Sequence, residues 1–328
     1  MSQTSNCYDG GKVLVSVLLL TQAEVERLLD PDALLNALAE GFKALSESTV
    51  SAPPRNQATT PDGILLAMPG WAPGNHIAVK LVTVFHGNVQ RGLPGHQALI
   101  CLFDAETGTP AAMMDGTYIT AMRTAGGAAL ATRLLARPSA HVLAIIGAGV
   151  QGKAHLTLLP RVRPSTEIRI ASRDRTHAQR LAAADPRARV ASSFEEAVRG
   201  ADIVCLCTAS QDPVIDPAWL KPGAHVTSVG YHPPGGELPR ALAEHGRLFV
   251  ETRGAFAPPP AGCAELEGLD PEKATELGEV LLSRRPGRQS AEEITVYKSM
   301  GHAVEDMVTA NLVYRRAVAE GAGRLVDF

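Results

Sequence analysis

The sequence predicts an α/β protein with a doubly wound parallel sheet and a second α+β domain. From His141 onward, apolar runs of strand length alternate with helical patterns, as in parallel βαβ units. Before His141, most strand-like runs are separated by turns, such as Pro69-Gly70 and Thr107-Gly108, and not by helices. The length of 328 residues leaves room for two domains and a substantial core.

A glycine-rich turn marks the start of the alternating region. The apolar run 142–146 leads through Gly147-Ala148-Gly149-Val150-Gln151-Gly152 into a helical pattern, and a second apolar strand follows at 168–171. One GxGxxG proves little in a chain with 30 glycines, but the strand before it and the helix and strand after it make it specific. The three glycines permit a tight turn, close approach of a pyrophosphate, and close helix packing. We therefore predict a Rossmann-type dinucleotide site; the alternative is a plain strand-to-helix turn.

The end of the second strand indicates which dinucleotide binds. An acidic residue there accepts from the ribose of NAD, whereas an arginine accommodates the 2′-phosphate of NADP. Ser172 and Arg173 offer a hydroxyl and a guanidinium. Asp174 is the acidic alternative, although it is also placed to cap a helix starting near Thr176. The sequence favours NADPH over NADH.

The first part of the chain begins with a strand predicted at 13–20. Thr21 and Glu24 have the spacing of a capping box. Asp30 and Pro31 are an N-cap and an N1 proline for a helix reaching about Ser46. The proline-rich stretch 51–61 is expected to be loop. Strands are expected at 64–68, 77–83, 98–103 and 111–114, and a helix rich in small residues at 118–135.

The second part of the chain continues the α/β alternation after the glycine motif. Helices are expected at 178–184 and 194–199, and strands at 189–191, 203–207, 224–229 and 247–251. A last helix at 301–319 follows the completed parallel sheet, and we expect it to return to the first domain.

Composition narrows the partners. The net charge is -3 without a basic block, which disfavours nucleic acid and anionic membranes as partners. The apolar run 13–20 is too short to span a bilayer. The five cysteines form no CxxC and are expected to be reduced thiols of a cytoplasmic protein. No His/Cys/Asp cluster has metal-ligand spacing, so no metal is expected.

Several motifs together resemble the ornithine cyclodeaminase/mu-crystallin family. They lie at 92–98, 115–125, 147–151, 221–225, 276–280 and 298–306. The resemblance extends over about residues 15–320 and implies a homodimer. It also implies a discontinuous substrate-binding and dimerisation domain, 1–125 plus 302–328, around a dinucleotide-binding domain, 126–301. Members act on small α-amino or α-imino acids.

Candidate substrate residues come from charge and from this resemblance. A substrate carboxylate needs a fixed cation, preferably a guanidinium, and Arg123 on the helix before the first dinucleotide strand is the best candidate. Lys80 is a charge within an apolar strand, for which the alternative is a structural salt bridge. The family match makes both residues catalytic and substrate-binding: Arg123 grips the substrate carboxylate, and Lys80 contacts this carboxylate or delivers a proton to the amine. Arg55 matches a third cationic position of the family and is a further candidate for substrate binding. Met68 and Gln97 are expected to line the substrate pocket.

Other histidines and the cofactor contacts complete the expected site. His96 is a candidate proton relay or a core histidine, and His225 and His302 are more simply packed histidines. The residues expected to contact the cofactor are Thr124, Gly147, Gly149, Val150, Gln151, Ser172, Arg173, Thr208 and Ala209.

The leading functional hypothesis is an NADPH-dependent reductase of cyclic ketimines or imino acids such as 1-pyrroline-2-carboxylate and 1-piperideine-2-carboxylate. The alternatives are an alanine-type or N-alkyl amino-acid dehydrogenase, an ornithine cyclodeaminase, and a non-catalytic NADPH-bound ligand-binding protein. Cyclodeamination is disfavoured because His232 stands where the resemblance places a catalytic aspartate. Glu237 is a weak substitute for that aspartate, and capping a helix is its simpler role.

Overall fold

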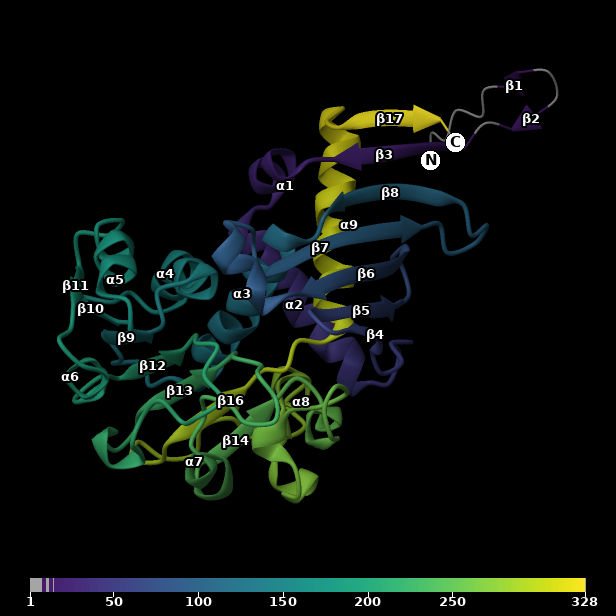
Figure 1. Ribbon diagram of the computed structural model, residues 1–328. Helices are drawn as coiled ribbons and strands as arrows, with labels where there is room; N and C mark the ends of the chain where they lie inside the picture. The colour runs from purple at the N-terminus through teal and green to yellow at the C-terminus, as the bar shows by residue number, and fades with distance from the viewer. Residues whose placement is uncertain (1–7, 10–11, 14, 328) are drawn as a thin grey trace.

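The computed structural model describes residues 8–9, 12–13 and 15–327, and two large β-sheets dominate it. One sheet has eight strands in the order β11-β10-β9-β12-β13-β16-β14-β15, all paired in parallel. The other has seven strands in the order β17-β3-β8-β7-β6-β5-β4. Figure 1 shows the two sheets next to each other, with β3 and β17 at the edge farthest from the parallel sheet. The prediction of an α/β fold with a parallel sheet is confirmed.

The parallel sheet is wound in two directions from β9. The chain moves outward through β10 and β11 and then returns to β12 on the other side of β9. The strands are β9 (Val142–Ile146), β10 (Glu167–Ala171), β11 (Ala188–Val190), β12 (Ile203–Leu206), β13 (His225–Ser228), β14 (Arg247–Val250), β15 (Thr275–Glu276) and β16 (Thr295–Lys298). Ligands of such sheets bind at the carboxyl ends of the strands where the winding reverses, here between β9 and β12.

Helices cover both faces of the parallel sheet. Leu143 and Ile145 of β9 belong to one hydrophobic core, and Val142, Ala144 and Ile146 belong to another, because successive side chains point to opposite faces. The helices are α4 (Val150–Val162), α5 (Arg175–Ala182), α6 (Phe194–Val198), α7 (Arg240–His245) and α8 (Leu277–Leu281). Short 3₁₀ helices lie at Pro217–Trp219, Arg253–Phe256, Ala264–Leu266 and Pro271–Lys273.

The seven-stranded sheet is mostly antiparallel. Its strands are β3 (Ser16–Leu20), β4 (Asn56–Thr60), β5 (Gly63–Gly70), β6 (Ile77–Val84), β7 (His96–Phe103), β8 (Pro110–Asp115) and β17 (Arg324–Asp327), with a 3₁₀ helix at His86–Arg91. A small pair, β1 (Tyr8–Asp9) with β2 (Lys12–Val13), precedes it. The prediction of a loop over 51–61 is wrong at Asn56–Thr60, which form β4. Every residue of β4 is exposed, so this edge strand has no apolar alternation to reveal it.

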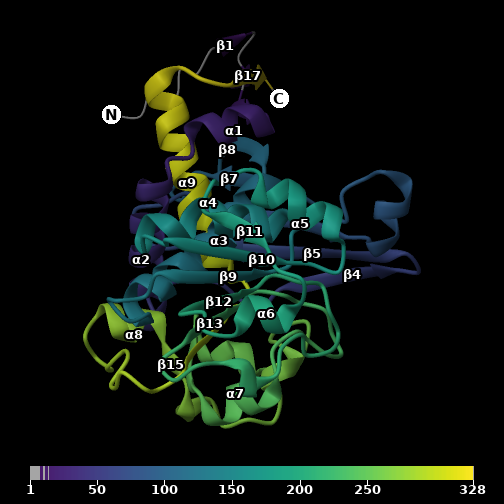
Figure 2. The ribbon, with the colours of Figure 1, turned by 90° about the vertical axis from the view of Figure 1, so that its left-hand side faces the viewer.

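Four helices pack beside the seven-stranded sheet: α1 (Gln22–Leu28), α2 (Pro31–Ser46), α3 (Thr117–Leu135) and α9 (Ala303–Glu320). The predicted starts of α1 and α2 are confirmed, because Thr21 forms the capping box with Glu24 and Asp30 caps the next helix. Helix α9 packs against α2 and against β6, as expected of the last helix (Figures 1 and 2). No helix in the described part of the chain is long and apolar enough to cross a membrane.

The two faces of this sheet differ. Met68, Lys80 and Ile100 share the face covered by helices and are buried. Leu65, Leu81 and Leu99 point to the other face and remain 38%, 37% and 49% exposed.

All strands of the parallel sheet fall within 142–298, and those of the seven-stranded sheet within 16–115 and 324–327. The domain boundary placed at 125/126 falls inside helix α3 and stays a prediction.

Candidate active site

The glycine motif has the geometry that a dinucleotide needs. Gly147 has φ +106°, and a Cβ there would lie 2.5 Å from the carbonyl oxygen of Cys207. A Cβ on Gly152 would lie 2.2 Å from the carbonyl oxygen of Gly147. At Gly149, by contrast, no atom lies within 4 Å of the Cβ position, which leaves space for a phosphate. Gly147, Gly149 and Gly152 therefore match the predicted roles of turn, phosphate approach and helix packing, in that order.

The start of helix α4 is open to a ligand. Gly149 is its N-cap and provides no side-chain oxygen to the first amide groups. Val150 is 68% exposed, and Oε1 of Gln151 is buried without a hydrogen-bond partner among the described residues. Free amides at a helix N-terminus suit the negative charge of a pyrophosphate. These residues fit a dinucleotide.

The end of β10 places Ser172 and Arg173 side by side. Ser172 is half-buried, and Arg173 is exposed without an ion pair to any described residue. Asp174 caps α5, where its Oδ1 accepts from the amides of Thr176 at 2.8 Å and His177 at 3.2 Å. The predicted capping role of Asp174 is confirmed. These hydrogen bonds hold one oxygen of the carboxylate on its own helix and leave Arg173 as the charged side chain at the strand tip.

Glu237 joins the two loops that follow β12 and β13. Its carboxylate is fully buried and accepts five hydrogen bonds: from the amide and hydroxyl of Thr208, at 2.6 and 2.7 Å, and from Ser228 Oγ and the amides of Val229 and Gly230, at 3.0, 3.1 and 2.7 Å. The expectation that Glu237 caps a helix is wrong, since α7 starts at Arg240 after Pro239. Glu237 instead fixes Thr208 and Gly230 at the carboxyl edge of the sheet.

A buried ionic cluster lies where three elements meet. Lys80 of β6 places Nζ 2.7 Å from Oδ2 of Asp306 on α9. Arg123 of α3 places Nε 3.1 Å from Oδ1 of Asp306 and Nη1 3.1 Å from Oε2 of Glu305. The side chains of Lys80 and Asp306 are each 2% exposed. The structure thus brings together the two residues predicted to be catalytic and adds a carboxylate that links them.

Burial and charge set the protonation of this cluster. Burial lowers the pKa of Lys80 to about 8, with Arg123 and Arg55 acting in the same direction and Asp306 against them. Burial also raises the pKa of Glu305 above its ordinary range, although Arg123 opposes this shift. Burial acts to raise the pKa of Asp306 too, but Arg123 and Lys80 outweigh it and hold the net pKa below the usual range. Lys80 and Arg123 are two cations, and Asp306 is the carboxylate whose pKa is held low enough to keep it ionised. This excess of positive charge favours an anionic ligand.

Arg55 approaches the cluster from the segment before β4. Its Nη2 donates to the carbonyl oxygens of Met300 at 3.2 Å and Gly301 at 2.8 Å, and its guanidinium lies 5.7 Å from the ring centre of Tyr231. Arg123 packs against the same turn, because a Cβ on Gly301 would lie 2.5 Å from its Nη1. Both arginines therefore contact the turn at 300–301.

The remaining predicted substrate residues lie on opposite faces of the sheet. Met68 pairs directly with Lys80 across β5 and β6, so its buried side chain lies beside the lysine. Gln97 pairs with Thr83, an odd number of residues from Lys80, and its exposed side chain is on the other face. Within one chain, the structure does not bring Gln97 to the cluster.

Other predicted residues take clear positions. Thr124 is buried next to Arg123, and Ala209 is exposed after β12. The carbonyl oxygen of Ala209 lies 2.6 Å from Nδ1 of His232. His225 is buried at the first residue of β13, at the opposite sheet edge from the glycine motif, and burial lowers its pKa to about 3. His302 caps α9 through Nδ1, so both histidines are packed as expected.

Lys298, Glu265 and Glu251 are among the buried charges that received no role from sequence reasoning. Lys298 ends β16 and donates to the Gly230 carbonyl and to Glu265, each at 2.7 Å. Glu251 follows β14 and accepts from Ser299 Oγ at 2.6 Å and from the amide of Gly301 at 3.1 Å. A charged residue at or directly after the end of a buried strand was the sequence signal that could have identified Lys298 and Glu251. These residues hold the loops around the cluster.

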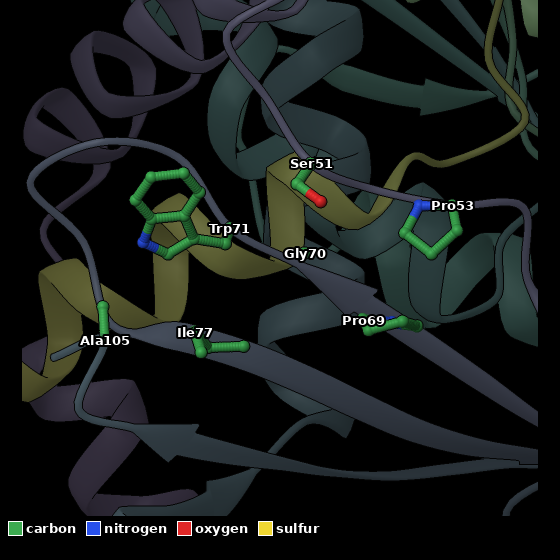
Figure 3. A pocket seen from close by; sticks show the side chains of 7 residues that line it. All are labelled: Ser51, Pro53, Pro69, Gly70, Trp71, Ile77 and Ala105. Atoms are coloured by element: carbon green, nitrogen blue, oxygen red, sulfur yellow. The ribbon is translucent and has the colours of Figure 1, made fainter. Parts of the chain in front are cut away.

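A separate hollow of about 500 Å³ lies at the end of the seven-stranded sheet (Figure 3). Its lining residues are Ser51, Pro53, Pro69, Gly70, Trp71, Ile77 and Ala105. Pro69 and Ile77 point to the sheet face opposite Lys80, and no lining residue carries charge. The hollow is therefore not the site of the chemistry. In the described residues, no group of three or more His, Cys, Asp or Glu side chains is placed to hold a metal ion.

Comparison with known proteins identifies the family of this chain. The ketimine reductase mu-crystallin of Mus musculus is 40% identical over 255 residues, which span 77% of this chain and 80% of that protein. The structure of Thermococcus litoralis Delta(1)-pyrroline-2-carboxylate reductase in complex with NADH and L-proline matches with TM-score 0.89 and 30% identity, over 94% of this chain and 100% of that one. An archaeal alanine dehydrogenase dimer with bound NAD matches with TM-score 0.86 and 31% identity, over 95% and 99%. The model of the ornithine cyclodeaminase/mu-crystallin family matches residues 15–321, and the chain belongs to this family.

Proposed function

We propose that this chain is an NADPH-dependent reductase of cyclic ketimino acids, of the 1-pyrroline-2-carboxylate and 1-piperideine-2-carboxylate type, and forms cyclic L-amino acids. The observation that carries the proposal is the buried cluster of Lys80, Arg123 and Asp306 beside a dinucleotide-binding sheet edge. The cluster presents cations to a small anion and a lysine able to give up a proton near neutral pH. The similarity to proteins named as ketimine and pyrroline-carboxylate reductases supports the same substrate class.

The protein side of the reaction follows from the cluster. The bound cofactor supplies the hydride to the carbon of the C=N bond. Arg123 holds the substrate carboxylate, because Nη2 of its guanidinium has no partner among the described residues while Nε and Nη1 are held by Asp306 and Glu305. Lys80 donates the proton to the ring nitrogen. Its burial favours the neutral amine that remains after proton transfer.

The preference for NADPH rests on the tip of β10. A 2′-phosphate needs a cation and a hydrogen-bond donor, and Arg173 and Ser172 offer both. Asp174 engages the amides of α5, which makes it a poorer ligand for a ribose hydroxyl. NADH remains the alternative cofactor.

Homodimerisation is proposed from the uncovered sheet face. Leu65, Leu81 and Leu99 form an apolar stripe on β5, β6 and β7, on the face opposite the helices. A second copy of this stripe is the matching partner, and the similar alanine dehydrogenase is described as a dimer. Leu99→Lys is expected to convert dimer to monomer in light scattering, whereas Val318→Lys, at the exposed end of α9, is expected to leave the dimer intact.

The function is tested by NADPH absorbance with preformed cyclic ketimines and, separately, with keto acids plus ammonia or methylamine. We expect the highest kcat/KM for a cyclic ketimine. A higher value for pyruvate plus an amine would instead support the alanine-type or N-alkyl dehydrogenase. Binding of ligands without turnover of any imine would support the non-catalytic alternative.

Cyclodeamination of ornithine is not expected. Glu237 is fully buried and its carboxylate already accepts five hydrogen bonds, so it does not bind the ammonium group of ornithine. His232 carries no fixed negative charge. Incubation with ornithine and a trace of NAD is expected to release neither ammonia nor proline. Release of both in equal amounts would contradict these assignments.

A further inference from the structure

Asp306 is the only carboxylate that contacts both basic groups of the cluster within the described residues. Oδ2 lies 2.7 Å from Nζ of Lys80 and Oδ1 lies 3.1 Å from Nε of Arg123. Its neighbour Glu305 contacts Arg123, and no ion pair joins it to Lys80. The two adjacent acids of α9 therefore have different partners, although both are buried.

We propose that Asp306 is a positioning residue of the reductase: it keeps Lys80 charged and directed toward the substrate nitrogen and sets the distance from Lys80 to Arg123. This inference rests on the proposed function. Asp306 acts through Lys80 and does not itself touch the substrate. One carboxylate thereby couples the group that binds the carboxylate of the substrate to the group that donates the proton.

The charges around Lys80 explain why such a residue is needed. Arg123 of α3 and Arg55 before β4 both disfavour its ammonium form, and burial acts in the same direction. Asp306 of α9 opposes them. Glu305 and His302, also at the start of α9, Glu251 after β14 and Tyr297 of β16 are further charged or titratable groups around the cluster. Without Asp306, two guanidinium groups and burial act on Lys80 with no adjacent carboxylate to balance them.

The proton transfer balances with Lys80 as donor. The C=N carbon gains a hydride from NADPH, and the nitrogen gains a proton from the Lys80 ammonium. The products are a cyclic amine, NADP⁺ and a neutral Lys80, which then takes a proton from water. Turnover therefore requires the ammonium form and falls as pH rises through the pKa of Lys80, about 8.

The test compares Asp306→Asn with the matched variant Glu305→Gln. The pH dependence of kcat is measured from about pH 6 to about pH 10 with 1-pyrroline-2-carboxylate and NADPH. In Asp306→Asn, the loss of activity at high pH is expected to move down by roughly one pH unit or more. In Glu305→Gln, KM for 1-pyrroline-2-carboxylate is expected to rise, while the loss of activity at high pH (the high-pH limb of the profile) is expected to occur at the same pH as in the wild type. Using one substrate for all variants removes the ionisation of the imine from the comparison.

A measurement without turnover separates this inference from the proposed function. The chain is labelled with ¹³Cε-lysine, and the Lys80 signal is identified by its absence in Lys80→Met. Its titration midpoint is expected to fall in Asp306→Asn and to stay unchanged in Glu305→Gln. Absence of ketimine reduction in the wild-type protein would refute the function but leave this result readable.

Two outcomes overturn the inference. The first is that, in Asp306→Asn, neither the pH at which activity is lost nor the titration midpoint of the Lys80 signal changes. The second is an equal shift in Asp306→Asn and Glu305→Gln. Should Asp306→Asn not fold, Asp306→Glu takes its place: because the charge is kept, the limb is expected to stay while kcat falls about tenfold from the displaced ammonium. A shift of the limb by about one pH unit in that variant would equally overturn the inference.

Discussion

Replacing Glu237 by glutamine is expected to loosen both loops at the carboxyl edge of the parallel sheet. The carboxylate accepts from Thr208 with one oxygen and from Ser228, Val229 and Gly230 with the other. A glutamine keeps one acceptor oxygen but replaces the other with an NH₂ group. This NH₂ group faces backbone N–H donors and cannot accept their hydrogen bonds. At least one buried amide then loses its acceptor, which costs about 1–3 kcal/mol, and the remaining bonds lose their charge assistance.

The expected total is about 3 kcal/mol, or a fall in melting temperature of about 5 °C for a chain of this size. Because Thr208 lies in the loop predicted to contact the cofactor, NADPH affinity is expected to fall about tenfold, equivalent to about 1.4 kcal/mol. Thermal unfolding and NADPH fluorescence titration measure the two effects. Glu267→Gln is the matched control, since Glu267 is exposed and its side chain has no partner among the described residues. Equal melting temperatures and equal NADPH affinities in the two variants would refute this role of Glu237.

Three further outcomes are expected. Arg123→Lys should raise KM for the ketimine about ten- to a hundredfold with little change in NADPH affinity, because the ammonium of lysine cannot make the two parallel hydrogen bonds of a guanidinium to a carboxylate. Steady-state kinetics and NADPH titration measure the two effects. An equal loss of NADPH affinity would contradict the assignment. Arg173→Ala should reduce the NADPH preference in kcat/KM about ten- to a hundredfold, from loss of a charge-assisted contact of about 1.5–3 kcal/mol; a wild-type preference for NADH would reverse the assignment. Asp202→Asn should destabilise the protein by about 2–3 kcal/mol, because this buried carboxylate accepts from Arg137 and Lys221 at 2.8 and 2.7 Å. Burial acts to raise the pKa of Asp202, but the amides of His141 and Val142 and the ammonium of Lys221 outweigh it and hold the pKa below its usual range. The contribution of this carboxylate to stability is therefore present above about pH 4 and is lost as pH falls further. Urea unfolding at several pH values should show that the free energies of unfolding of wild type and variant converge only in acid.

Features encoded within a few residues were readable from the sequence. The glycine motif, the Thr21–Glu24 capping box and the cap at Asp30 are all present as predicted. A cap depends on a side chain reaching amides two or three positions away, and a glycine depends on its own φ angle and nearest neighbours. Strand and helix periods likewise depend only on which residues are apolar. Such signals do not require knowledge of the rest of the fold.

The assembly of the charged cluster was not readable in this way. Sequence reasoning selected Lys80 and Arg123 but gave no role to Asp306, since nothing local distinguishes it from Glu305, and it misjudged Glu237 as a helix cap. Edge strand β4 was missed because its exposed residues carry no burial pattern. Gln97 and Met68 were grouped together, yet the register of β5, β6 and β7 places them on opposite faces. Pairing register and the packing of α9 bring together groups far apart in the chain, and their free energy depends on burial that exists only once both sheets have formed.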